Sequence, residues 1–240
     1  MAEIYFVWLG SGRAKRRRVG PEGQLLDQAA KAGLPVAPGA ILLDEFYRVC
    51  LEKGLAEMLG GRLIIPDPEL MHATLFHSAR LPRFERPVAA NLIVPADIDE
   101  DALPTESFQS LIIDAGRPDE LARALAVAWK AADHNDARRD VLLIEEIAAE
   151  HSGRACMGVD QREHQIERDG RDDSEQASFS LPVLTGWQKP DEELPPYARR
   201  LQMLLRGVRR TFGRGEWVVE WADDGDSCRL RRITAPRPLS

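Results

Sequence analysis

The chain has 240 residues, of which 44% are hydrophobic and 30% charged, and its formal net charge is -7. This composition is typical of a globular protein with one large or two small domains, and no apolar run approaches the roughly 18 residues of a membrane helix. The apolar N-terminal run is too short and too lightly flanked by positive charge for a secretory signal, so we expect a soluble cytoplasmic protein with no membrane partner.

The cysteines and the charge distribution narrow the chemistry further. Cys50, Cys156 and Cys228 lie far apart without metal-ligand or redox spacing, which predicts reduced thiols that fill the core.

The net acidity argues against nucleic acid as the main partner. Residues 1–40 nevertheless carry +3 and residues 196–240 carry +5, which leaves -15 for the middle. Two basic ends can neutralise that acidic centre or jointly face an anion, and neutralisation is favoured because exposed charges are mostly solvated.

Apolar periodicity predicts strands and helices in alternation along the first half. The expected strands are residues 4–9, 62–65, 88–94 and 108–113, and the expected helices are residues 24–32, a segment beginning at Asp44, residues 67–79, and residues 118–132. Asp44 and Asp67 are expected as N-caps, and Pro68 suits the first turn after Asp67.

The second half reads as strand pairs around one basic helix. A strand is expected at 141–148, with a turn and a second strand after it, and two closing strands at 217–221 and 228–234. Residues 160–178 are charged and predict a flexible loop or an exposed hairpin around Asp169 and Gly170. A helix over 197–212 ends at Gly213. Together these elements predict an α+β (α/β) fold with mixed, largely antiparallel sheets and flanking helices.

The sequence "GSGR" at 10–13 follows a strand, but the dinucleotide fingerprint is incomplete because residue 15 is lysine. Arg16, Arg17 and Arg18 extend a basic run that can bind phosphate through charge-assisted hydrogen bonds. A solvated basic loop is the favoured interpretation.

The histidines and acidic clusters give no catalytic or metal motif. His72 and His77 are five residues apart and form a poor metal pair on a helix, while the other histidines are expected past a helix end, in a turn and in the polar loop (His134, His151, His164). An acidic cluster could attract a divalent cation or form a solvated loop; it consists of Asp97, Asp99, Glu100 and Asp101. The solvated loop is favoured, because the spacing of these acids fits no cation-binding loop. No nucleophile elbow is present.

Four segments, in order, resemble the N-terminal nucleotide-binding domain of phosphoenolpyruvate synthase and pyruvate phosphate dikinase, an ATP-grasp relative. They are "VGPEGQLLDQAAKAGLPVAPGAILLDEFYR", "EDALPTESF", "VLLIEEIAAEHSG" and "VVEWADDG". The resemblance covers most of the chain and implies an ATP-grasp-like fold with a first lobe at 1–115 and a shortened second lobe at 116–240. In the family this domain binds ATP and magnesium.

The same resemblance locates altered positions. Glu22 stands where the family has a phosphate-contacting lysine, Asn91 stands where it has an arginine, and Ile144 stands where it has a glutamine. A glutamine near the end of the family's domain corresponds to Arg231 or Arg232 here. Of the acids that lie near the metal in the family, Glu220 is present in this sequence. The family's glycine-rich segment has no counterpart between 158 and 190.

Loss of a lysine and an arginine removes electrostatic stabilisation that phosphoryl transfer requires. We therefore expect a degenerate, non-catalytic domain that acts as a regulatory or partner-binding protein, with a protein partner or a second copy of itself. The alternative is a pared-down ATP-binding phosphotransferase subunit that works with separate carrier and phosphoenolpyruvate domains, with Arg16, Arg17 and Arg18 replacing the lost cations and Glu220 holding magnesium. A third hypothesis is an anion-binding module for a phosphorylated metabolite or RNA.

Overall fold

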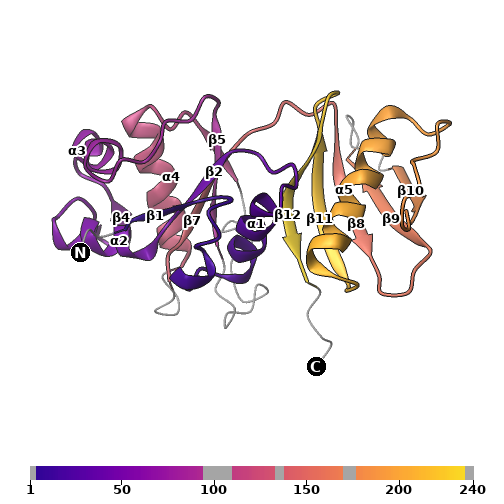
Figure 1. Cartoon of the computed structure of the whole chain (residues 1–240). Helices are drawn as coiled ribbons and strands as arrows, with labels where there is room; N and C mark the ends of the chain where they lie inside the picture. Colours follow the sequence, from indigo (N-terminus) through magenta and orange to yellow (C-terminus); the bar gives the residue numbers. More distant parts are fainter. Residues whose placement is uncertain (1–3, 94–109, 133–137, 170–176, 236–240) are drawn as a thin grey trace. The chain divides into compact units, whose positions relative to one another are not determined.

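A computed structural model describes residues 4–93, 110–132, 138–169 and 177–235 (Figure 1). The chain forms two compact units. Unit 1 consists of Met1–Asp27 and Pro38–Glu146, and unit 2 consists of Gln28–Ala37 and Ile147–Ser240. Residues 116–146, which the expected division after residue 115 assigns to the second lobe, lie in unit 1 because their helix and strand pack onto its sheet.

Unit 1 is built on a five-stranded sheet. In spatial order its strands are β1 (Phe6–Trp8), β2 (Gly39–Leu42), β7 (Val141–Glu145), β5 (Val88–Leu92) and β6 (Leu111–Ile113), and each neighbouring pair is antiparallel. The unit also has a small antiparallel pair, β3 (Glu57–Leu59) and β4 (Arg62–Ile64), of which the sequence pattern predicts only the second.

The helices of unit 1 follow the predicted order. They are α1 (Pro21–Lys31), whose last turns belong to unit 2, α2 (Asp44–Glu52), α3 (Pro68–Ala73) with a π-helical continuation Thr74–Ser78, and α4 (Pro118–Ala131). The N-cap prediction for Asp67 is confirmed, because its carboxylate accepts the N–H of Leu70 at 2.9 Å. A short 3₁₀ turn, Lys15–Arg17, interrupts the predicted loop before α1.

The core of unit 1 lies between the sheet and α4. The apolar side of α4 buries Leu121, Leu125 and Trp129, each at most 1% exposed. These side chains belong to one hydrophobic cluster with Val141 and Leu143 of β7. The i, i+4, i+8 spacing on the helix and the i, i+2 spacing on the strand explain why these residues face one another.

The prediction that Asp44 is the N-cap of α2 is wrong. The N-cap residue is Leu43, which has no side-chain acceptor, and Asp44 is the first helical residue. The carboxylate of Asp140, just before β7, instead accepts the N–H of Asp44 at 2.9 Å. Asp44 in turn accepts the N–H of Arg139 at 3.0 Å. A distant carboxylate thus satisfies an amide at the start of the helix, which sequence spacing alone does not reveal.

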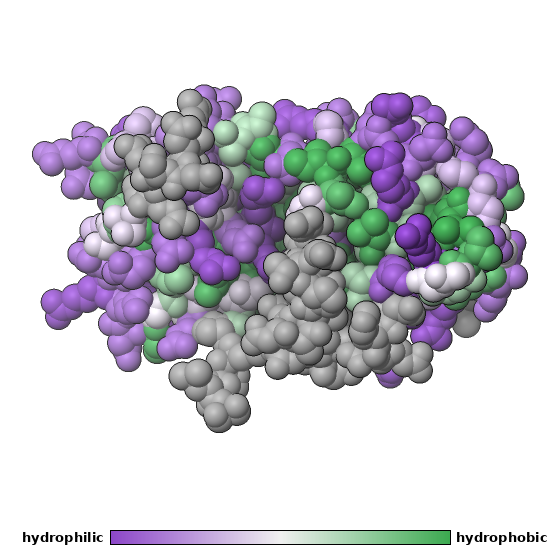
Figure 2. All heavy atoms as spheres, turned by 180° about the vertical axis from the view of Figure 1, so that it is seen from behind, coloured by the Kyte–Doolittle hydropathy of each residue, from purple (hydrophilic) through white to green (hydrophobic). Residues whose placement is uncertain are grey.

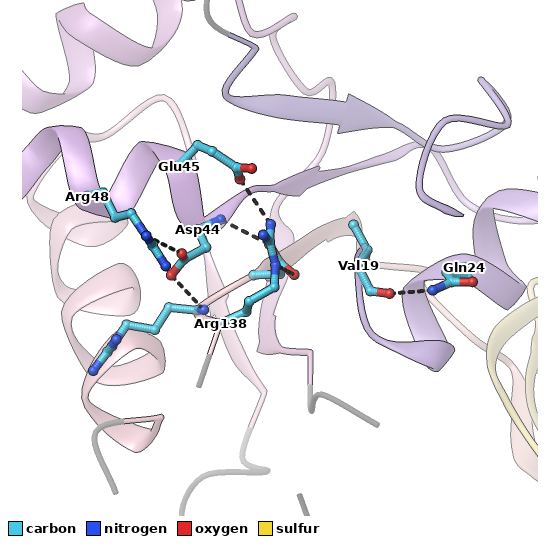
Figure 3. A network of polar contacts seen from close by, with 8 residues as sticks. Val19, Gln24, Asp44, Glu45, Arg48 and Arg138 are labelled. Carbon is cyan, nitrogen blue, oxygen red and sulfur yellow. Dashed lines mark hydrogen bonds and ion pairs between the residues drawn. The ribbon is translucent and has the colours of Figure 1, made fainter. Parts of the chain in front are cut away.

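Arg138 joins this network, which Figure 3 shows from close by. Its guanidinium contacts Asp140 at 3.0 Å and Glu45 at 2.9 Å. Burial raises the pKa of Asp140, although hydrogen bonds from Arg138 and from the N–H of Asp44 offset part of that rise. The network links α2 to the start of β7.

Unit 2 is a second five-stranded antiparallel sheet. Its spatial order is β10 (Ala177–Pro182), β9 (Glu163–Arg168), β8 (His151–Met157), β11 (Trp217–Asp223) and β12 (Cys228–Thr234). β9 and β10 confirm the hairpin interpretation of the charged segment 160–178, and β11 and β12 confirm the closing pair. Helix α5 (Pro196–Phe212) lies along one face (Figure 1) and contacts β10, β11 and β12.

The face of this sheet under α5 is apolar. Val219 and Trp221 of β11 and Leu205 of α5 are fully buried. Arg200 of α5 forms a bidentate ion pair with the fully buried Asp223, at 2.7 Å and 2.6 Å, which fixes the helix on the sheet.

The predicted α+β fold class with antiparallel sheets and flanking helices is confirmed. Every pair of neighbouring named strands is antiparallel, and the one parallel pairing among the described residues is a single bridge between Val36 and Leu230. The core role of two cysteines is also confirmed, because Cys50 and Cys228 are buried and burial raises the pKa of each thiol, that of Cys50 to about 12.

The surface is mixed rather than uniformly apolar. Hydrophilic and hydrophobic residues are interspersed on the face shown in Figure 2. Within the described ranges, no helix combines the length and the hydropathy needed to cross a bilayer.

Candidate functional site

The backbone amides of the glycine loop in unit 1, residues 10–14, donate hydrogen bonds to a carboxylate of the protein itself. The carboxylate of Asp27, on the buried side of α1, accepts the backbone N–H groups of Gly10 at 2.9 Å, Gly12 at 3.0 Å and Ala14 at 2.9 Å. Asp27 is only 2% exposed. Positive φ angles of 89° at Gly10 and 68° at Gly12 let successive amides point inward, as in a phosphate-binding nest. An external phosphate would have to displace Asp27 to use these amides.

The basic residues after this loop lie at the protein surface. Arg16 and Arg18 are exposed and Arg17 is half-buried. The backbone turns sharply here, since Arg18 has a φ of 56°. Within the described ranges, none of the three side chains has a hydrogen bond or an ion pair. This agrees with the favoured interpretation of a solvated basic loop.

Glu22 and Gly23 lie in the first turn of α1. A carboxylate at this position is stabilised by the positive end of the helix dipole, so Glu22 also has a structural role. Gly23 is required by packing, because a Cβ there would lie 2.6 Å from Val19 Cγ1 and 2.9 Å from Ile93 Cδ1. Packing therefore accounts for a glycine at this position independently of any ligand.

Two other family-like positions are in the sheet of unit 1. Asn91 is half-buried in β5, and its Oδ1 accepts the hydroxyl of Ser110. Ile144 in β7 is 8% exposed. Neither side chain supplies a positive charge to an anion.

Glu220 and Arg231 lie together in unit 2. Both line a hollow of about 290 Å³ on the side of the sheet away from the α5 core. Its charged lining is Arg154, Glu167, Arg168, Asp169, Glu220 and Arg231. Arg154 and Arg232 flank Glu220, with nitrogen–oxygen distances of 3.8 Å and 4.0 Å.

A β-bulge explains how two adjacent arginines reach this side of the sheet. Glu220 pairs with Arg232 and Trp221 pairs with Leu230, so Arg231 is the extra residue of β12. A bulge directs neighbouring side chains away from strict alternation. The nitrogen–oxygen distances of these ion pairs exceed the roughly 2.8 Å of a charge-assisted hydrogen bond, so the contacts to Glu220 are weak.

The charges of this hollow nearly balance. Three carboxylates and three guanidinium groups line it. Ser152 also donates a hydrogen bond to Asp169 at 2.7 Å. A polyanion therefore meets repulsion as well as attraction at this face, unlike a site built only from cations.

A magnesium ion held by protein groups alone does not fit here. Among the residues that the structure describes, no three His, Cys, Asp or Glu side chains group closely enough to hold a metal. The partners of Glu220 are arginines, which compete with a cation for its oxygens. The acidic cluster Asp97, Asp99, Glu100 and Asp101 lies outside the described residues, as does His134.

The expectation that His164 lies in a polar loop is wrong. It lies in β9 and is 3% exposed, because alternate residues of this strand face the core under α5. Burial, together with the charge of Arg209, lowers the pKa of His164 to about 4, so the ring is neutral near pH 7. His151 begins β8 rather than lying in a turn, and its ring centroid lies 4.2 Å from that of Tyr197.

Sequence reasoning missed Asp27, whose role is the most informative feature of the loop. The available signal was an acid on the apolar side of the amphipathic helix that follows the G-x-G turn and its basic segment. A buried acid needs donors, and loop amides are the nearest ones.

The sequence matches no protein-family model, and a search of curated proteins also finds no match. Among solved structures, the chain is similar to a RimK domain ATP-grasp protein from Sphaerobacter thermophilus, with 15% identity over 95% of this chain and 62% of that chain at a TM-score of 0.46. It is also similar to the VanG D-Ala:D-Ser ligase from Enterococcus faecalis, with 12% identity over 89% and 51% at 0.47. A third similar structure is phosphoribosylamine–glycine ligase from Thermotoga maritima, with 14% identity over 91% and 48% at 0.48.

The chain thus spans between 48% and 62% of the length of these three structures.

Proposed function

We propose that this chain is an ATP-grasp-like nucleotide-binding domain of the phosphoenolpyruvate synthase and pyruvate phosphate dikinase type that no longer transfers a phosphoryl group. In this proposal it acts as a regulatory or partner-binding protein. In this proposal the scaffold of the domain is retained, while its affinity for the triphosphate of ATP is reduced.

The observation that carries the proposal is the position of Asp27. Its carboxylate accepts three N–H groups of the glycine loop, each within 3.0 Å. A catalytic phosphate loop must keep such donors for the phosphates whose developing charge it stabilises. This loop precedes the segment 19–40 that resembles the family's phosphate loop, and its donors stabilise the fold of unit 1, so they are not available to a phosphate.

Three further positions support the same conclusion by charge. Glu22 puts a negative charge at the lysine position, Asn91 is engaged with Ser110, and the hollow at Glu220 contains as many carboxylates as guanidinium groups. Each change weakens attraction for a polyphosphate. Arg154, Arg231 and Arg232 remain as anion-binding groups near Glu220, which is consistent with weak nucleotide binding.

The test combines calorimetry with a turnover assay in the presence of magnesium. We expect weak ATP binding that falls in Arg231→Ala, with neither ADP nor a phosphorylated protein formed. Arg229→Ala is the matched control, because Arg229 lies on the same strand and pairs with Asp224 instead. Tight binding coupled to turnover would refute the proposal.

The alternative function is a phosphotransferase subunit in which Arg16, Arg17 and Arg18 replace the lost cations. Three adjacent arginines, two of them exposed, form a cluster of positive charge that supports this candidate. It predicts that the triple alanine variant loses nucleotide binding and phosphoryl transfer to a carrier domain. Unchanged ATP affinity in that variant would eliminate it.

A further inference from the structure

A second hollow in unit 2 contains only positive charge. Its volume is about 470 Å³, and it lies between the C-terminal half of α5 and the turn that follows β10. Its charged lining is Arg206, Arg209, Arg210 and Arg214, and Leu184 and Trp187 contribute apolar surface. None of the described residues that line it is Asp or Glu.

Within the part of the chain that the structure describes, none of the four arginines forms an ion pair with an acid. Arg206 donates to the carbonyl of Gln188 at 2.7 Å, and Arg209 donates to the carbonyl of Gly158 at 2.6 Å. Arg210 and Arg214 are exposed and have neither a hydrogen bond nor an ion pair within the described ranges. Four guanidinium groups around one hollow create a positive potential that attracts anions.

Arg209 adds a second argument for an anion. Its Nε is buried and donates to no acceptor among the described residues. A buried charged group is costly unless it is paired. The neighbouring His164 is neutral and offers no negative charge. Arg209 therefore has a donor without an acceptor among the described residues, and its side chain lines the hollow.

Trp187 supplies a flat apolar surface beside these charges. It is 99% exposed, although large aromatic side chains usually bury most of their area. The turn that carries it is ordered by hydrogen bonds between Thr185 and Gln188, at 2.9 Å and 3.1 Å, and by a φ of 56° at Gly186. Such a ring, next to guanidinium groups, can stack on a planar ligand group.

We propose that this hollow binds a small phosphate-bearing ligand that also carries a flat ring. The arginines contact the phosphate and Trp187 lies against the ring. The volume matches small-molecule sites, whereas a polynucleotide would require an extended basic stripe and conflicts with the net charge of -7. The site uses none of the residues around Glu220 and is independent of the proposed function.

Binding can be measured by calorimetry with AMP, pyrophosphate and adenosine, alongside any change in tryptophan fluorescence that Trp187→Ala abolishes. We expect AMP and pyrophosphate to bind and adenosine not to bind. Because Arg210 and Arg214 are exposed, the double variant Arg210→Ala/Arg214→Ala should fold normally and lose about tenfold or more in affinity for both anions. Trp187→Ala should weaken AMP but leave pyrophosphate unchanged. Arg199→Ala, on the same helix but outside the hollow, is the matched control.

The variants Glu220→Gln and Arg231→Ala separate this proposal from the proposed function. If they weaken AMP and the double arginine variant does not, the second site is refuted while the proposed function survives. If only the double arginine variant weakens AMP, the second site is supported. Binding of an acidic peptide or a single-stranded oligonucleotide without binding of AMP or pyrophosphate would refute the small-ligand assignment.

Discussion

The carboxylate of Asp27 accepts the N–H of Ala14 at 2.9 Å, and both residues are buried. The two are 13 residues apart: Asp27 lies in the middle of α1 and Ala14 lies in the loop before it. The contact makes the loop part of the folded core of unit 1 rather than a free ligand-binding segment. The proposed loss of phosphoryl transfer depends on this assignment.

Removal of the Asp27 carboxylate should destabilise unit 1. Asp27→Ala leaves three loop amides without their acceptor, and we expect it to lower the free energy of unfolding by about 3 kcal/mol. Urea unfolding followed by circular dichroism measures the change. Gln28→Ala, the next residue of α1, is the matched control. A loss no larger than that of the control would show that the loop does not depend on Asp27.

A lysine at residue 22 should restore part of the affinity for nucleotide. Glu22→Lys exchanges repulsion for attraction at the family's lysine position, so we expect ATP affinity to rise by about tenfold or more. Glu22→Gln should give an intermediate value. The helix start would lose about 0.5 kcal/mol, because a cation is unfavourable there. If calorimetry shows equal ATP affinity in all three proteins, the resemblance at this loop has no functional meaning.

Removal of the Asp140 carboxylate, which accepts the first N–H of α2, should destabilise unit 1. Asp140→Ala leaves the N–H of Asp44 without its acceptor and deprives Arg138 of its most buried partner, so we expect a loss of about 3 kcal/mol. Nucleotide affinity should not change. Asp160→Asn, at an exposed acid, serves as the control in the same unfolding experiment. An equally small effect in both variants would contradict the structural role of Asp140.

His164 predicts a pH dependence of stability in unit 2. Its pKa is lowered to about 4 in the folded chain and is about 6.5 when the chain is unfolded, so the unfolded state binds the proton more readily. The stabilisation is complete above pH 6.5 and is lost as the pH falls towards 4. Linkage gives a loss of about 2 kcal/mol at pH 5.

Unfolding of the parent protein and of His164→Gln at about pH 7.5 and pH 5 checks this value. The parent protein should lose about 2 kcal/mol more than the variant on acidification. His77→Gln, at an exposed histidine, should behave like the parent protein. Parallel losses in the parent protein and His164→Gln would rule out a titrating His164.

Local sequence signals predicted most of the elements. The Asp67–Pro68 start of α3, the span of α4 and the end of α5 at Gly213 depend on capping and on apolar periodicity, which are encoded within a few residues. The strand pair β3 and β4 was half missed, because the residues of β3 are exposed and give no apolar alternation. The cap of α2 was assigned to the wrong acid, because its acceptor lies 96 residues away.

The site was predicted less completely, for a similar reason. The resemblance named Glu220 and Arg231 as site residues, but it could not reveal the bulge that turns Arg231 onto this side of the sheet, because a bulge is a property of strand pairing. The role of Asp27 depends on three amides that only the folded loop directs inward. The hollow at Trp187 combines a helix and a turn whose proximity no local pattern encodes.

The most direct test of the central claim is a phosphoryl-transfer assay with ATP labelled in the γ-phosphate and magnesium in excess. The account predicts that the label stays on ATP at the rate seen in buffer, for the parent protein and for Glu220→Gln alike. Release of label, or its transfer to the protein, that disappears in Glu220→Gln would contradict the account and favour an active phosphotransferase.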